Sequence, residues 1–260
     1  MSKFIKKLEA VGQSTPIPMG FGSRTQMVGT PAVLLVGLLS VQELQEAPSL
    51  AQSPVDALLI KSNLSELNLL SDIFTQSAGL LWGLRLDETS AKEVEKVREM
   101  GCDFLVFDAE GASADILQDQ ETGKVLTIDM TLEEGMARAI EDSLVDAVLL
   151  VPIQEILPLT VQRLLEIQSV RTLVAKPFLI EISAPPGGKG LECLRDADIS
   201  GVVMSLSQGG EVIQRVRQEI DSIPRRKPKA ERPGAIIPRL SPGLGTARPR
   251  REEEEEEEEE

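Results

Sequence analysis

The chain contains no histidine and no tyrosine among its 260 residues, and these two absences exclude several kinds of site. Histidine is the commonest general base near neutral pH and the commonest side-chain ligand of transition metals. Ser-His-Asp catalysis, Cys-His catalysis and histidine-ligated zinc are therefore excluded. Any chemistry must rely on carboxylates, lysines, backbone amides or a bound cofactor.

Cysteine and long apolar runs are also scarce. Only Cys102 and Cys193 are present, which is too few for a disulfide framework and favours a reducing, cytoplasmic location. We expect both to be packing residues. No apolar run reaches the roughly 18 residues of a membrane span, so the sequence predicts no transmembrane segment.

The net charge of −15 is unevenly distributed along the chain. Residues 225–251 hold nine Lys or Arg against a single acid, and residues 252–260 are nine consecutive Glu, so these charges nearly cancel and residues 1–224 carry −14. Such an acidic body argues against nucleic-acid binding, which needs clustered cations. Residues 224–260 lack helical or strand periodicity and predict a disordered Pro/Arg-rich linker with a poly-Glu tail.

Short apolar runs recur along the chain at nearly even spacing. Their starts lie about 21 to 31 residues apart, which is the length of one strand, one helix and two loops. The runs span residues 31–39, 55–61, 79–87, 102–108, 124–130, 145–152, 176–183 and 199–207. Eight such units predict a (β/α)8 TIM-type barrel over residues 31–223, preceded by an N-terminal helix and loop over residues 1–30. An open doubly wound parallel sheet is the alternative, because periodicity alone does not close a barrel.

Local signals place several helices. Residues 2–10 form an amphipathic pattern that predicts a helical plug on the barrel floor. The capping-box spacings of Ser90 with Glu93 and of Thr131 with Glu134 predict helices over residues 91–100 and 132–143. The segment 111–124 leaves room for only about two helical turns.

Charged residues follow several strands where a barrel of this type carries its reacting groups. A charge pointing into the helix layer would be costly, so we expect these side chains to converge on the barrel mouth. The side chains expected to converge are Lys61, Asp87, Asp108, Asp129 and Glu181, and Arg85, Glu110 and Ser183 lie at the same strand ends. Among them, Lys61, Asp108 and Glu181 are the candidates for proton transfer.

The placement of one lysine and three carboxylates resembles that in enolase-superfamily barrels. In that superfamily a lysine ends the second strand and carboxylate metal ligands end the third, fourth and fifth, as Lys61, Asp87, Asp108 and Asp129 do here. The resemblance implies a Mg²⁺ cofactor on Asp87, Asp108 and Asp129. The chain has no room for the capping domain of that superfamily, and its lysine does not belong to a Lys-x-Lys pair.

Glycine-rich loops follow the seventh and eighth strands, where many barrels bind phosphate through backbone N–H groups and a helix N-terminus. In this respect residues 31–222 resemble the phosphate-binding barrel group. The expected anion contacts are Gly187, Gly188, Lys189, Ser207, Gly209 and Gly210, with Arg85, Asp87, Glu110 and Ser183 as further ligand contacts. Glycine pairs are also common in ordinary turns, which is the alternative interpretation.

Together these patterns predict a barrel that binds a small anionic ligand. The function expected is that of a lyase or isomerase acting on a phosphorylated or carboxylated metabolite. The alternative is a catalytically inactive barrel that serves as a binding or scaffold protein, which the absence of histidine and tyrosine favours. The sequence does not decide between the two.

Overall fold

The computed structural model describes residues 2–11, 31–47, 52–67, 69–70, 81–87, 89–152, 157–187 and 189–224. The chain divides into two units, residues 1–227 and 228–260, and every described residue belongs to the first. The predicted loop between the N-terminal helix and residue 31, and the predicted tail beyond its first residue, Pro224, lie outside the described residues.

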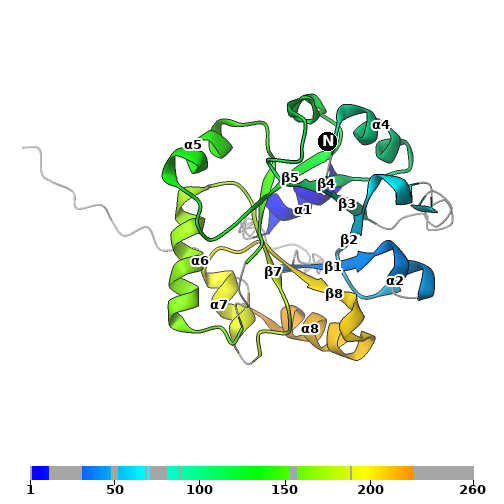
Figure 1. The fold of residues 1–260 in the computed structure, drawn as a ribbon. Coiled ribbons are helices and arrows are strands. Elements are labelled where there is room, and N and C mark those ends of the chain that lie inside the picture. Colours follow the sequence, from blue (N-terminus) through cyan, green and yellow to red (C-terminus); the bar gives the residue numbers. More distant parts are fainter. Residues whose placement is uncertain are drawn as a thin grey trace, which may run out of the picture. The chain divides into compact units, whose positions relative to one another are not determined.

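Eight parallel strands close into a barrel in chain order (Figure 1). They are β1 (Leu34–Ser40), β2 (Ala57–Ser62), β3 (Trp82–Leu86), β4 (Phe104–Phe107), β5 (Gly123–Ile128), β6 (Ala147–Leu150), β7 (Phe178–Ile182) and β8 (Gly201–Ser205). The first and last strands pair in parallel, with Leu34 opposite Gly201 and Leu38 opposite Ser205. The barrel prediction is confirmed, and the open-sheet alternative is excluded because β1 and β8 are not edges.

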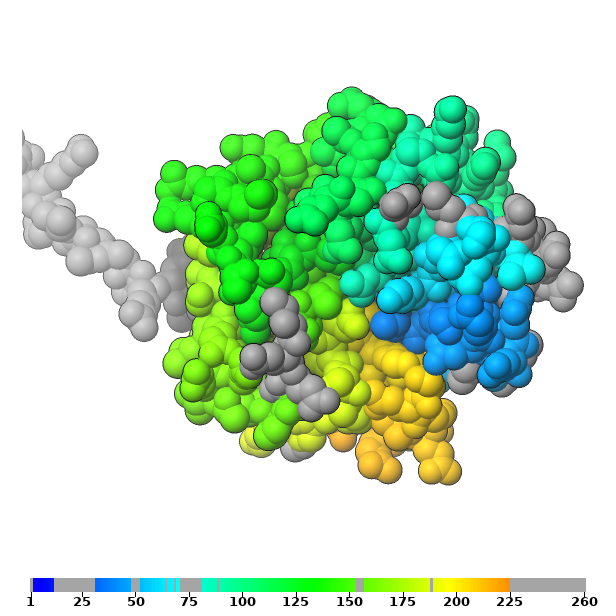
Figure 2. All heavy atoms as spheres, viewed as in Figure 1, coloured from blue at the N-terminus to red at the C-terminus, as the bar shows by residue number. Residues whose placement is uncertain are grey.

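Helices surround this barrel, and the units follow one another around the molecule in sequence order (Figure 2). The α-helices are α1 (Lys3–Ala10), α2 (Val41–Glu46), α4 (Ala91–Glu99), α5 (Glu134–Asp142), α6 (Val161–Leu173), α7 (Gly190–Asp196) and α8 (Gly210–Ser222). Short 3-10 helices are η2 (Leu64–Glu66), η3 (Ala114–Gln118) and η4 (Leu206–Gln208). The fourth unit thus has a single five-residue 3-10 helix, in agreement with the little room that its sequence leaves.

The strands are apolar on both faces because both faces are buried. Side chains alternate between an outer layer against the helices and an inner layer inside the barrel. In β2, for example, Leu58 and Ile60 belong to the outer cluster, whereas Ala57 and Leu59 belong to the inner one. This alternation decides which residues at the strand ends face the mouth.

Helix α1 fills one end of the barrel, as the amphipathic pattern predicts. Its Phe4, Ile5 and Leu8 are buried in the inner cluster. The Phe4 ring stacks on Phe104 of β4 with ring centroids 4.0 Å apart. The Asp103 carboxylate caps this helix by accepting hydrogen bonds from Ser2 Oγ (2.6 Å) and from the backbone N–H groups of Lys3 (2.9 Å) and Phe4 (2.8 Å).

An aspartate stands immediately before three even-numbered strands, at the end of the barrel that α1 fills. Asp103 precedes β4, Asp56 precedes β2 and Asp146 precedes β6. Asp56 accepts the backbone N–H of Leu35 in β1 at 2.9 Å, and Asp146 accepts that of Lys124 in β5 at 2.8 Å. These carboxylates satisfy strand-start donors that lack a partner in the ladder, so they have structural roles.

One of the two predicted helix starts is correct and the other is wrong. Helix α4 begins at Ala91 with the Ser90–Glu93 capping box formed. Helix α5 begins at Glu134, two residues later than predicted, because Thr131 does not act as its cap. Both the backbone N–H and the hydroxyl of Thr131 instead donate to Asp129 Oδ1, each at 2.7 Å.

Candidate functional site

The candidate site is the barrel mouth, at the carboxyl ends of the strands and opposite the end that α1 fills. Alternation from the inner-cluster residues Leu59, Val106 and Leu179 directs the side chains two positions onward to the same inner face. Those side chains are Lys61, Asp108 and Glu181. Lys61 and Glu181 lie within β2 and β7 and so take inner positions, whereas Asp108 comes directly after the last residue of β4.

A salt bridge crosses this mouth. Arg85 Nη1 donates to Glu181 Oε2 at 2.9 Å, and the two side chains are 17% and 27% exposed. Arg85 lies near the end of β3 and Glu181 near the end of β7, on opposite sides of the barrel because three strands separate β3 from β7 in either direction. The pair spans the lumen just above the apolar inner layer and forms the polar floor of the mouth.

Lys61 lies beside this salt bridge. It is opposite Arg85 in the parallel register of β2 and β3, so two cations stand next to each other on one wall. Lys61 and Asp108 are exposed and form no ion pair with another described residue. Asp87 and Glu110 are likewise exposed at the ends of their strands. Of the residues predicted at these strand ends, only Arg85 and Glu181 are joined to each other by a hydrogen bond or ion pair.

The predicted metal ligands do not form a cluster. Among the described residues, no group of three carboxylate or thiolate side chains is placed to hold a metal ion, so Asp87, Asp108 and Asp129 do not come together as the enolase-like pattern implies. Asp129 turns to its own loop, where its carboxylate accepts both donors of Thr131. The residues present therefore do not fit a Mg²⁺ site of that kind, and no step through a metal is derived.

The two glycine-rich loops lie side by side at the mouth. Gln208 Nε2 in the second loop donates to the carbonyl of Ser183 in the first. Gly187 and Gly209 have φ angles of 55° and 100°, in the left-handed region that favours glycine. The backbone conformation of each loop therefore favours glycine at one position, whether or not the loop binds a ligand.

The N-terminus of α8 lies open in the second loop. Gly210 begins the helix, and Gly209 precedes it without a side-chain cap. A Cβ at Gly210 would meet nothing within 4 Å. Ser207 Oγ is paired with Ser205 Oγ at 2.5 Å, and Lys189 is exposed at the start of α7. Gly188 lies outside the described residues.

Sequence reasoning missed two residues of this region. Thr127 shares the inner face with Val125, and its hydroxyl donates to the carbonyl of Phe107 at 3.3 Å. Strand alternation could have identified Thr127, because it stands two residues after an inner valine. Gln208 could not have been identified, since its role depends on how two loops far apart in the sequence pack together.

The comparisons with known proteins show the fold. No protein-family model and no curated protein match this sequence. The α-subunit of tryptophan synthase from Campylobacter jejuni superposes with a TM-score of 0.55 at 13% identity, over 77% of this chain and 100% of that one. A mutant α-subunit from Pyrococcus furiosus gives 0.54 at 9% identity, over 72% and 96%. Tryptophan synthase from M. tuberculosis gives 0.53 at 10% identity, over 73% and 93%.

None of the helices in the described ranges combines the length and apolar character that a bilayer-spanning helix needs. Identities this low establish a shared architecture and leave the reaction to be argued from the residues themselves. The chain is a TIM barrel with a polar mouth, built around a salt bridge between Arg85 and Glu181.

Proposed function

We propose that this barrel binds a small anionic metabolite at its mouth and acts on it as a lyase or isomerase. The observation that carries the proposal is the salt bridge across the mouth, with Lys61 in register beside Arg85. Two adjacent cations suit a carboxylate or phosphate group, because a guanidinium offers paired donors and an ammonium adds charge.

Ligand binding and proton transfer would be linked at this site. An anion that takes the Arg85 guanidinium competes directly with the Glu181 carboxylate. The Glu181 carboxylate would then be free of Arg85 and close enough to the bound ligand to accept a proton from it. Asp108 and Lys61, on the same inner face, are the other groups that could donate or accept a proton. Without a ligand, the salt bridge satisfies both charges.

The glycine-rich loops support the phosphorylated class of ligand. The N–H groups of Gly210 and Glu211 have no partner within α8, as is usual for a first helical turn. Open space at Gly210 gives an anion access to them. The exposed Glu211 carboxylate in the first turn opposes this and would have to turn away.

A thermal-shift experiment tests the anion site. Phosphate, and separately malonate, should raise the thermal midpoint relative to chloride at equal ionic strength, because each would bind only the folded state. Lys61→Met should reduce both shifts, whereas the matched surface variant Lys92→Met should leave them unchanged. Equal midpoints in all three salts would contradict anion binding at the mouth.

A second variant separates the two ligand classes. Gly210→Val adds a side chain at the α8 N-terminus without steric conflict inside the protein. It should remove the shift by phosphate and spare the shift by malonate if the phosphate group lies on the loops. Gly209 is unsuitable for this purpose, because its φ of 100° would strain any other residue.

Catalysis is tested by proton exchange. In deuterated water, the wild-type protein should exchange a carbon-bound hydrogen in one of a panel of phosphorylated or carboxylated carbonyl compounds, and Glu181→Gln should abolish that exchange. A panel with no exchange and no cleavage would favour the inactive barrel.

An exposed pair on α6 favours that second function, a binding or scaffold protein. Val161 and Leu165 are 75% and 59% exposed and lie one helical turn apart on the same side of α6. Apolar side chains so exposed and so close are common at protein contacts. The variant Val161→Glu with Leu165→Glu should change the mass in solution if this face joins copies of the chain.

A further inference from the structure

The fourth unit leaves the outer face of the barrel incompletely covered. Five residues of 3-10 helix η3 stand where a longer α-helix would otherwise pack, and they bury only Ile116 fully. The outward-facing residues of β5 show the consequence. Leu126 and Ile128 are 7% and 8% exposed, whereas their register partners in β6, Val148 and Leu150, are both 0% exposed.

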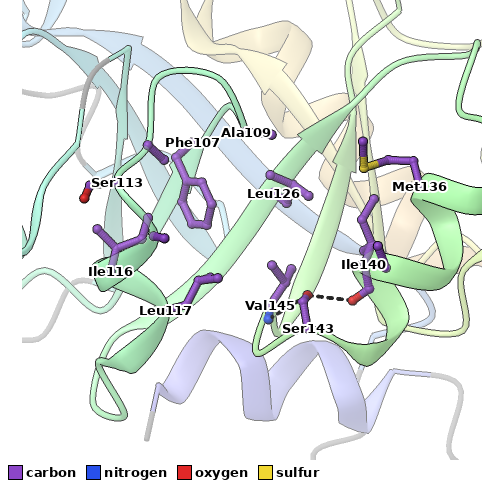
Figure 3. Close-up of a pocket in the computed structure, with 13 residues that line it drawn as sticks. Phe107, Ala109, Ser113, Ile116, Leu117, Leu126, Met136, Ile140, Ser143 and Val145 are labelled. Atoms are coloured by element: carbon purple, nitrogen blue, oxygen red, sulfur yellow. Dashed lines mark hydrogen bonds between the residues drawn. The ribbon is translucent and has the colours of Figure 1, made fainter.

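A cavity of about 240 Å³ lies at this place. The sheet contributes Phe107 and Leu126, η3 contributes Ile116 and Leu117, and α5 contributes Met136 and Ile140. These side chains surround one space between η3 and α5 (Figure 3). We call this cavity the β4–α5 pocket.

The β4–α5 pocket is separate from the barrel mouth. Phe107 lines the pocket from the outer face of β4, and its neighbour Val106 packs on the inner face in the cluster inside the barrel. The two sites therefore lie on opposite sides of the same strand end, and a ligand in one does not touch the inner face that forms the other.

The lining determines the chemistry of a ligand. None of the residues that line the pocket carries a charge. The hydroxyl of Ser143 is already engaged, since it donates to the carbonyl of Ile140 at 2.6 Å and accepts from the N–H of Val145 at 3.3 Å. Ser113 is exposed at the edge, and its hydroxyl forms no hydrogen bond with another described residue. An ionised ligand would lose its hydration without compensation.

The volume and the rim point to a small molecule. Apolar cavities of about 150 Å³ bind a single benzene ring, so this larger pocket has room for two fused rings. Met136 is 57% exposed at the rim, and its flexible thioether adapts readily to different ligand shapes. A protein segment would need a longer groove, because an extended chain advances about 3.3 Å per residue.

We propose that the β4–α5 pocket binds a small, uncharged, mainly aromatic molecule with one polar atom near Ser113. The ligand completes the outer layer that a full helix would provide in this unit. Burial of its apolar surface against Phe107, Leu126 and Ile140 drives binding. The pocket is independent of the activity proposed for the mouth.

The probe for this proposal is 2-naphthol, titrated into the full-length protein and followed by its fluorescence. One saturable site is expected. The ionised analogue 2-naphthoate should bind at least tenfold more weakly, since the pocket has no cation to receive it. A naphthoate that binds as well as or better than naphthol would place the ligand at the cationic mouth and overturn the proposal.

Two matched variants locate the site. Ala139→Phe adds a ring to an exposed alanine that lines the pocket, and Ala91→Phe adds the same ring to an exposed alanine on α4 that does not. The first should weaken 2-naphthol binding at least tenfold, and the second should leave it unchanged. Glu181→Gln should also leave it unchanged. Equal effects of the two phenylalanines would contradict the proposal.

Methyl NMR of the wild-type protein gives an answer that needs no variant. Addition of 2-naphthol should shift the methyl signals of Ile116, Met136 and Ile140. Shifts confined to Val161 and Leu165, or no saturable binding at all, would overturn the proposal. A dimer that 2-naphthol dissociates would also overturn it, because a second copy of the chain would then be the occupant.

Discussion

Single residues at the strand ends decide what the mouth can do. The position of a charged residue relative to the apolar alternation determines whether it faces the lumen or the helices. Arg85 and Glu181 both occupy inner positions of their strands, between outer residues, and they meet across the lumen although 96 residues separate them in sequence. Their side chains are partly exposed, so solvent screens the pair to some extent.

Removal of one partner of this salt bridge should lower the free energy of unfolding more than removal of both partners. We expect Arg85→Met and Glu181→Gln each to lower the free energy of unfolding by roughly 1–2 kcal/mol, a discounted form of the larger cost seen for fully buried pairs. The double variant should recover part of the loss. Urea unfolding of the four proteins measures the coupling. Strictly additive losses would mean that the two side chains do not interact in solution.

The two cysteines should differ sharply in reactivity. Burial raises the pKa of the Cys102 thiol from 9.0 to about 12, and the protonated thiol donates a hydrogen bond to the Phe104 carbonyl at 3.2 Å. Cys193 is half-buried on α7. A thiol-specific chromogenic reagent at pH 8 should therefore label one equivalent in the native protein and the second only after unfolding. Rapid reaction of both thiols would show that β4 opens readily at its start.

Cys102 also contributes to the pH dependence of the free energy of unfolding. In the unfolded chain the Cys102 thiol ionises near pH 9, whereas in the folded chain it stays protonated up to about pH 12. The unfolded state therefore binds fewer protons between these values, and stability falls as the pH rises through them. Cys102→Ala should lessen the fall in thermal midpoint between pH 8 and pH 10.5.

At the scale of elements, α1 and η3 determine how well the barrel is filled and covered. Helix α1 closes one end, with its first turn held by a carboxylate from the start of β4. Space for the helix comes partly from Gly123, where a Cβ would lie 2.7 Å from Ile5 and 2.8 Å from Ser2. The five residues of η3 have the opposite effect, since they leave a pocket on the outer face.

Loss of the Asp103 carboxylate should release α1. Asp103→Ala removes the acceptor of three hydrogen bonds and leaves the first turn of the helix uncapped. We expect the free energy of unfolding to fall by about 2–3 kcal/mol. Trypsin should then cleave faster after Lys3, Lys6 and Lys7 under native conditions. Asp115→Ala, at an exposed aspartate on η3, is the control and should change neither measurement.

At the scale of the whole molecule, residues 31–224 complete the barrel without the tail. The β1–β8 pairing closes it, and α8 packs Ile213, Val216 and Ile220 into the outer layer. Ile223 is the last buried residue among those described, and the carbonyl of Pro224 accepts a hydrogen bond from Arg195 at 2.5 Å. The strand pairings that close the barrel thus all precede residue 225.

Truncation after Pro224 should leave the fold intact. It removes nine cations and ten acids, so the net charge changes only from −15 to −14. We expect the thermal midpoint to stay within about 2 °C of the full-length value, because surface changes of this kind alter stability little. Amide exchange of the full-length protein should show no protection over residues 225–260. Strong protection there would move the domain boundary toward the C-terminus.

The sequence by itself determined the number and order of the strands and left open whether the sheet closes. Eight apolar runs at nearly even spacing predict eight strands covered on both faces, and each observed strand lies within one of these runs or extends at most one residue beyond it. The plug helix, the start of α4 and the short fourth unit could also be predicted, because each depends on residues within one or two turns. The inner positions of Lys61 and Glu181 within their strands follow from the same local alternation.

Only the tertiary structure decided which of these side chains meet. The partnership of Arg85 with Glu181 and the bridge from Gln208 to Ser183 depend on strand tilt and loop packing, which periodicity does not encode. Closure of the barrel likewise needs β1 to reach β8 across the whole chain. Local patterns specify which face of a strand each side chain takes, whereas the distances between side chains across a barrel are set by how all eight strands pack together.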